Sequence, residues 1–268
     1  MEQLELTLLG GAGTALLRRR RPGADALPWD SLDRAAFSPA ALEEARALWT
    51  NAVFTEYASA AAFAALTSAF LECGAPIDLT ALAADSAVDE IDHAAHLSRL
   101  VMELGGAVRY EVDLALVSPA ATPGVSPLVR AAELAIKTSC VGEALSVPAL
   151  TRSRALAEQP LVRAVLDRLL RDEGRHARIG VWFLEATADR LSPADREHLA
   201  RVTLAAIAVY RPLWKKRCRD CLAPAALGAV PADDYAALLV DAVRTRIARP
   251  LRRLGIAIDG DELEALLG

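Results

Sequence analysis

Two pairs of side chains able to bind metal recur along the chain, each a glutamate followed three residues later by a histidine. A further glutamate precedes each pair by the length of one helix and a turn. In chain order, the six residues are Glu56, Glu90, His93, Glu143, Glu173 and His176. Two single glutamates and two Glu-x-x-His pairs, each on its own helix, form two-metal carboxylate centres in four-helix bundles. The spacing therefore predicts such a bundle and such a centre.

The helical faces that would carry the four glutamates are apolar or lined by small side chains. Positions three, four and seven apart share a face of an α-helix. Around Glu56 this face holds Trp49, Val53, Ala60 and Phe63. No lysine or arginine lies on any of the four faces. Buried carboxylates without partners are costly and repel one another. Two divalent cations would neutralise them, and the mixed oxygen and nitrogen donors suit iron or manganese better than calcium.

A single Glu-x-x-His on a helix is ordinarily a surface pair. Two copies in register, with two more glutamates on buried faces, favour the metal site. His96 follows His93 by one turn, so a further ligand role for it stays open. Cys140, one turn before Glu143, is expected to point toward the site, either as a packed small residue or in a redox role. His198 lies in a polar stretch and is expected to be exposed.

Serine-proline and glycine signals mark the ends of the expected helices. The expected helices cover Ser38–Cys73, Leu79–Leu104, Ser126–Ala157, Pro160–Arg190, Ser192–Cys221 and Ala232–Ala248. Pro148 predicts a kink inside the third helix, and Pro250 is expected to end the sixth. The C-terminal tail is expected to form a turn and a short amphipathic helix.

These elements predict an all-α protein with three regions. Residues 1–37 form an N-terminal arm or short helix, residues 38–190 the four-helix bundle, and residues 191–268 a helical extension packed on the bundle. The long connection over residues 107–125 would let the chain cross from one end of the bundle to the other. A composition of 53% hydrophobic but only 5% aromatic residues, rich in alanine and leucine, favours helices over strands.

Composition also excludes several classes of protein. The net charge of −5 argues against a nucleic-acid partner. No apolar stretch is long enough to span a membrane. Near the N-terminus the arginines follow the apolar run, whereas in a secretory signal the basic residues come first, so a cytoplasmic protein is expected. Cys218-x-x-Cys221 is the only close cysteine pair. A zinc knuckle would need a second such pair, so this one is not expected to do chemistry.

Over residues 38–190, the pattern resembles the ferritin-like superfamily of di-iron carboxylate proteins. Glu56-Tyr57-Ala58-Ser59 and Asp89-Glu90-Ile91-Asp92-His93-Ala94 are also similar to stretches of uncharacterised bacterial ferritin-like proteins. The resemblance implies a ferritin-like bundle with one long crossover. It implies that one metal is held by Glu56, Glu90 and His93, and the other by Glu143, Glu173 and His176. Glu90 and Glu173 would bridge the two ions.

An aspartate precedes the glutamate in both pairs. In the bacterial multicomponent monooxygenases, which this arrangement resembles, that aspartate is hydrogen-bonded to the histidine ligand of the opposite half. The resemblance implies that Asp89 orients His176 and that Asp172 orients His93. The alternative is that both aspartates simply face solvent.

The resemblance implies a di-iron oxidase or monooxygenase that uses O2 to oxidise a small organic substrate. Two iron ions are expected, with manganese or a mixed pair as alternatives. Because the sequence holds no flavin or iron–sulfur motif, electrons would come from an external ferredoxin or reductase. Dimers are common in this superfamily, so a homodimer is compatible with the resemblance. The alternatives are a ferroxidase or other iron-handling protein, and a metal-free helical scaffold. The sequence does not define the substrate.

Overall fold

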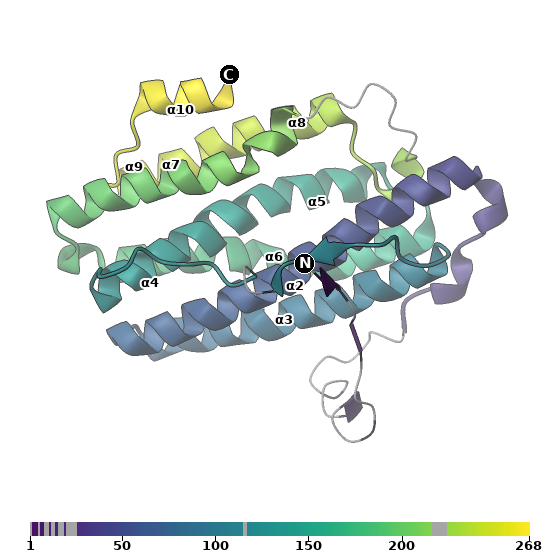
Figure 1. Ribbon diagram of the computed structural model, residues 1–268, viewed down its shortest axis with the longest axis horizontal. Coiled ribbons are helices and arrows are strands. Elements are labelled where there is room, and N and C mark those ends of the chain that lie inside the picture. The colour runs from purple at the N-terminus through teal and green to yellow at the C-terminus, as the bar shows by residue number, and fades with distance from the viewer. Residues whose placement is uncertain are drawn as a thin grey trace.

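The protein is a stack of long helices, seen in a computed structural model that describes residues 2–4, 6–7, 11, 14–15, 19, 26–114, 117–215 and 224–268. Helices α2 (Pro39–Cys73) and α3 (Ile77–Glu103) form one layer (Figure 1). The next layer contains α6 (Pro160–Ala186) and a continuous helix made of α4 (Pro127–Ala135), η5 (Ile136–Glu143) and α5 (Ala144–Leu156). Helix α2 packs on α3 and α4, and α6 packs on α3, η5 and α5, which closes a four-helix bundle. The predicted all-α bundle is confirmed.

Local sequence explains where the bundle helices begin. Ser38 and Ser126 accept hydrogen bonds from the backbone N–H groups of Ala41 and Val129, and a proline follows each serine at the first helical position. Gln159 caps α6 in the same way, ahead of Pro160. Gly74, with φ at 65°, ends α2 in the left-handed conformation that favours glycine.

The connection between α3 and α4 forms a short strand that the sequence did not indicate. Strand β1 (Glu2–Gln3) pairs antiparallel with β2 (Glu111–Val112), so the start of the chain lies against the crossover. The single-turn helices η2 (Trp29–Ser31) and η3 (Arg34–Ala36) lead into α2. The expectation of an arm or short helix therefore missed the strand pairing, because two-residue strands have no periodic signal.

The irregularity in the third bundle helix lies upstream of the proline that was expected to cause it. Residues 136–143 are π-helical, whereas α5 runs through Pro148. A π turn is wider than an α turn, and such turns are frequent at functional sites. Glu143 is the last residue of this segment.

The C-terminal part forms a third layer over the bundle (Figure 1). It comprises α7 (Pro193–Lys215), η7 (Ala225–Leu227), α8 (Ala232–Ala242), η8 (Val243–Ala248), α9 (Arg249–Arg253) and α10 (Gly260–Leu267), and it follows η6 (Ala188–Arg190). Pro250 does not end the sixth helix as expected. It lies in the first turn of α9, directly after the π-helical η8. We attribute this to the wider turn, which keeps the proline ring off the preceding carbonyl. None of the helices in the described ranges combines the length and hydrophobicity needed to cross a bilayer.

Buried apolar side chains form two clusters, and the predicted ligands lie between them. Along α2, Val53 belongs to one cluster and Phe63 to the other, with Glu56 between. Helix α6 repeats this order, with Leu169 before and Ile179 after the Glu173 pair. The bundle interior therefore has a polar layer with hydrophobic packing on both sides, which keeps water from this layer.

Candidate metal centre

The structure brings the six predicted ligand residues together in the middle of the bundle. They form two groups that share two glutamates, and within each group one ligand atom per residue lies within 4.8 Å of the others. The groups are Glu56, Glu90, His93 and Glu173, and Glu90, Glu143, Glu173 and His176. All six residues are buried, and Glu56, at 7%, is the most exposed. The shared pair, Glu90 and Glu173, is the pair for which the resemblance implied a bridging role.

Each histidine turns the same ring nitrogen toward the glutamates. The Nδ1 atom of His93 lies 3.3 Å from an oxygen of Glu56 and 3.3 Å from an oxygen of Glu173. The Nδ1 atom of His176 lies 2.7 Å from Glu90 Oε1. Imidazole binds a metal through an unprotonated nitrogen. The Nδ1 atoms are therefore the donors that face the centre.

The opposite nitrogen of each ring faces an aspartate. His176 Nε2 lies 3.2 Å from Asp89 Oδ2, and His93 Nε2 lies 3.4 Å from Asp172 Oδ2. Each contact joins the two halves of the centre, in the pairing that the sequence suggested. An aspartate at Nε2 holds the proton there and leaves Nδ1 free for a metal. Asp89 and Asp172 are buried and do not face solvent.

Unpaired buried atoms test whether a metal pair fits these residues. Among the residues that the structure describes, no hydrogen bond of normal geometry reaches either oxygen of Glu90 or of Glu173, or Nδ1 of His176, although His176 Nδ1 lies 2.7 Å from Glu90 Oε1. Buried polar atoms in folded proteins are nearly always paired, so these five require a partner. Carboxylate and imidazole donors match iron and manganese. The residues fit a di-iron site, and manganese satisfies the same donors.

Neighbouring charges shift the pKa values within the cluster. Burial and the carboxylate of Glu90 raise the pKa values of Glu56 and Glu143 well above the ordinary value. Burial alone would lower the pKa of His176, but the nearby carboxylates, Asp89 first among them, raise this pKa to about 12. Protons therefore partly neutralise the metal-free cluster, and a binding metal must displace them.

Two arginines of α6, for which the sequence pattern predicted no role, surround the aspartates. Arg175 forms an ion pair with Asp89 and lies 3.5 Å from Asp172 Oδ1. Arg168 lies 2.8 Å from Asp92 and 3.3 Å from Asp172. They do not lie on the helical faces that carry the ligands, so the pattern on those faces does not indicate them. The spacing to Asp172, four residues for Arg168 and three for Arg175, was the available signal.

The π-helical segment η5 carries Glu143 to the centre. It also makes a close contact with α6. Ser59 Oγ donates to Glu143 Oε1 at 3.2 Å. Ser139 Oγ donates to the carbonyl of His176 and accepts from the N–H of Gly180. A Cβ atom at Gly180 would lie 2.7 Å from the carbonyl oxygen of Ala135, so only glycine allows this approach.

Other residues singled out from the sequence belong to neither ligand group. His96 Nδ1 donates to the backbone carbonyl of Asp92, and its ring stacks on Trp29. Cys140 is buried, and its Sγ atom lies against Gly180. Burial raises the pKa of this thiol to about 12, which keeps it protonated and favours the packing role over the redox role. Cys218 and Cys221 lie outside the described residues.

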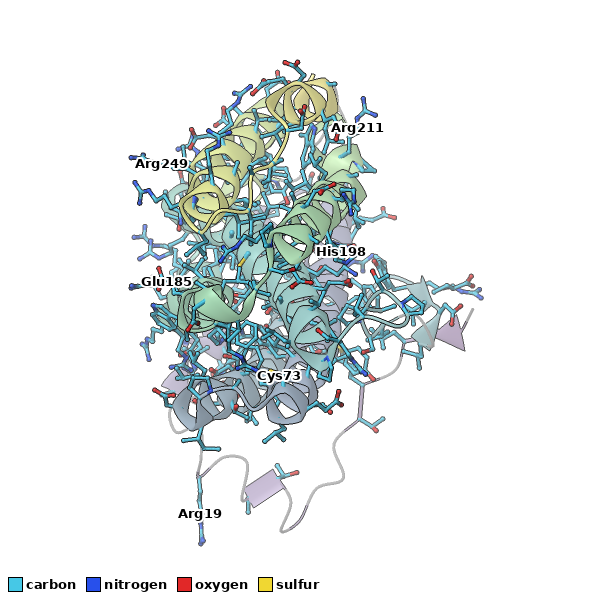
Figure 2. All side chains as sticks on the ribbon, turned by 90° about the vertical axis from the view of Figure 1, so that its left-hand side faces the viewer. Arg19, Cys73, Glu185, His198, Arg211 and Arg249 are labelled. Carbon is cyan, nitrogen blue, oxygen red and sulfur yellow. The ribbon has the colours of Figure 1, made fainter. Side chains whose placement is uncertain are left out.

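His198 was expected to be exposed, and this was wrong. It is half-buried on α7, at the boundary with the bundle (Figure 2), and its Nε2 atom lies 2.6 Å from Glu133 Oε1. Glu133 is a fully buried acid that also accepts from the backbone N–H of Thr122. The polar neighbours of His198 in sequence concealed a partner that lies 65 residues away.

Comparison with known proteins supports the fold. No protein-family profile matches the chain, and no curated protein sequence matches it. A solved structure described as "Protein 19 with aldehyde deformylating oxidase activity from Synechococcus" is similar, with a TM-score of 0.60. The two chains are 17% identical over 88% of this chain and 99% of that one. This similarity shows that the fold is a ferritin-like helical bundle, and the buried Glu/His cluster within it fits a di-iron centre.

Proposed function

We propose that the chain is a non-haem di-iron oxidase or monooxygenase that uses O2 to oxidise a small organic substrate. The observation that supports this most directly is the set of buried oxygens of Glu90 and Glu173, which lack hydrogen bonds of normal geometry and lie close to two histidine Nδ1 atoms between hydrophobic clusters. Bound ferrous ions would supply electrons to dioxygen there.

The residues of the cluster would have separate roles in metal binding, in ligand orientation and in the exclusion of water. Glu90 and Glu173 would bridge the ions, while Glu56 and Glu143 would each bind one of them. Asp89 and Asp172 would keep a proton on the Nε2 atom of each histidine, which leaves Nδ1 as the ligand atom. The two apolar clusters would exclude water and protect reactive species from side reactions.

A groove of about 370 Å³ lies between α2, α3 and the start of the chain, and we propose it as the route for the substrate, although none of the six ligands lines it. Its walls include Val53 on α2 and Ser98 and Val101 on α3. Val53 precedes Glu56 by one helical turn, and Glu56 is the most exposed of the ligands. Leu4 and Leu6 line the groove from the start of the chain. The walls combine these apolar side chains with the polar Gln3, Thr50 and Arg109, which suits an elongated apolar molecule that has one polar end.

The similar Synechococcus protein suggests which substrate to test first. It has aldehyde deformylating oxidase activity, so we propose an aldehyde as the first candidate. We further propose that electrons come from an external ferredoxin or reductase, and that the functional ions are iron, with manganese or a mixed pair as the alternative. A homodimer is compatible with this assignment.

Oxygen exposure of the anaerobic ferrous protein tests the proposal. Stopped-flow absorbance should record a transient visible band, and an added aldehyde should be consumed in an O2-dependent reaction when a chemical reductant is present. The Glu143→Ala and His176→Ala variants should lose both signals. Direct conversion to ferric mineral would instead indicate iron storage. A chain that takes up neither iron nor manganese would be a scaffold, and either result would overturn the proposal.

A further inference from the structure

The two Glu-x-x-His segments differ in charge at one equivalent position. The first reads Asp89-Glu90-Ile91-Asp92-His93 and the second Asp172-Glu173-Gly174-Arg175-His176. Directly before the histidine, one half therefore has an acid and the other a base. The remaining charged positions match, so this difference is not explained by the ligand pattern.

In the second half, the basic residue holds the two aspartates in place. Arg175 forms an ion pair with Asp89, which faces His176, and its guanidinium lies 3.5 Å from Asp172. The equivalent position on α3 is occupied by Asp92. Asp92 cannot hold these aspartates in this way, because it is itself an acid and is only 6% exposed. Its charge needs a partner of its own.

Arg168 supplies that partner and also contacts the His93 half of the centre. One nitrogen of its guanidinium lies 2.8 Å from Asp92 Oδ2, and another lies 3.3 Å from Asp172 Oδ2. The same Asp172 oxygen lies 3.4 Å from His93 Nε2. Asp92, Arg168, Asp172 and His93 therefore form one continuous set of polar contacts. The Arg168 side chain is only 14% exposed, which limits screening by water.

We propose that Asp92 and Arg168 are a positioning pair for the His93 ligand, replacing the role that Arg175 has in the other half. This rests on the proposed metal centre. Arg168 fixes the carboxylate of Asp172 so that Oδ2 accepts the Nε2–H of His93, and Asp92 fixes Arg168. The lone pair of His93 Nδ1 is then directed at the centre. Because Arg175 serves His176 through Asp89, loss of Arg168 affects mainly one of the two ions.

Cobalt(II) titration of the metal-free full-length protein tests the pair. Absorption of bound cobalt reports ligand geometry, and equilibrium dialysis counts the ions. The wild type should bind two ions. Arg168→Gln and Asp92→Asn should each bind one ion normally and the other about 10- to 100-fold more weakly, with an altered spectrum. The matched control Arg154→Gln, which removes an exposed arginine–aspartate pair between α5 and α6, should bind like the wild type.

A swapped variant separates positioning from packing. Asp92→Arg combined with Arg168→Asp places an arginine at the position equivalent to Arg175, so it should recover tight binding of both ions and the wild-type spectrum. Thermal melting of each metal-free variant identifies any variant that is simply unfolded. In that case Arg168→Lys, which keeps the charge but not the two-pronged contact, should bind the second ion with intermediate affinity.

The outcomes distinguish this inference from the proposed function. A wild-type chain that binds no cobalt, iron or manganese overturns the proposed metal centre and the positioning pair with it. A wild type with two ions, together with folded Arg168→Gln and Asp92→Asn variants of unchanged affinity and spectrum, overturns the positioning pair alone. Weakened binding that the swapped variant does not recover also contradicts it.

Discussion

Helix α2 carries Glu56 on regular α-helical turns, whereas Glu143 closes the π-helical segment η5. The two halves of the centre otherwise match, because each supplies two glutamates and a histidine whose Nδ1 faces the glutamates. The ligand set is thus nearly symmetric, while the backbone that carries it is not. Identical donors can be presented by different helical geometries when the surrounding packing compensates.

The packing that accompanies these two backbone geometries differs at the position four residues after each histidine. The first half has Leu97 there, fully buried in the cluster that includes Val53 and Leu100. The second has Gly180, where the backbone of η5 comes too close for any side chain. At this position the His93 half therefore has a packed leucine side chain, whereas in the His176 half the backbone of η5 occupies the equivalent space. The following predictions test this contrast.

The largest expected effect is loss of bound metal, which should differ between the two glutamates shared by both ligand groups and the ligands of a single group. Glu90→Ala or Glu173→Ala removes a residue that belongs to both ligand groups, so binding of both metal ions should be lost. Glu56→Ala should remove a ligand of only one group and leave about one ion per chain. Elemental analysis after anaerobic iron loading measures the count. Glu185→Ala, an exposed change on α6, is the control. Equal metal content in all variants would contradict the ligand groups.

Truncation of the leucine tests the half that is filled by a side chain. Leu97→Ala leaves a cavity beside the centre and should lower the free energy of unfolding by about 2–5 kcal/mol. Urea unfolding of the metal-free protein measures the loss. Leu71→Ala removes a leucine that is 63% exposed and should have little effect. Similar losses for the two variants would show that position 97 is not a core position.

Addition of a methyl group tests the half that is filled by backbone. Gly180→Ala places a Cβ atom 2.6 Å from Cys140 Sγ, and the strain should lower the free energy of unfolding by about 1–3 kcal/mol. Binding of the ion held by Glu143 and His176 should weaken more than binding of the other. Gly174→Ala, six residues earlier on the same helix, meets no atom within 4 Å and should stabilise the helix by about 0.5–1 kcal/mol. Equal effects would exclude the close contact.

The smallest effect concerns Glu133, a buried acid that has protein partners instead of a proposed metal. Burial raises the pKa of Glu133, but the hydrogen bonds from His198 and Thr122 outweigh this and bring it below its ordinary value of 4.5. The stability contributed by its charge is therefore present above pH 4.5 and is lost as the pH falls further.

Glu133→Gln should accordingly lower the free energy of unfolding by about 1 kcal/mol at pH 7, and the difference from the wild type should shrink below pH 4.5. Urea midpoints measured across this range report it. A difference that does not change with pH would show that the ionised form of Glu133 is not the stabilising one.

The residue pattern was sufficient to predict the bundle and the residues that meet at its centre. Ser38 and Ser126 fixed two helix starts, and helical spacing placed Glu56 and Glu143 inside. The π-helical segment could not be predicted, because its sequence is as compatible with α-helix as with π-helix. The contacts of Arg168 with Asp92 and of His198 with Glu133 also escaped notice, since these partners lie 76 and 65 residues away and no periodic signal encodes contacts at that distance.

Anomalous X-ray diffraction at the iron edge, from crystals of anaerobically loaded protein, tests the central claim most directly. Two peaks about 3.5–4 Å apart should lie between Glu90 and Glu173, one toward His93 and one toward His176. The absence of any peak at these side chains, or iron bound only elsewhere on the chain, would contradict the account.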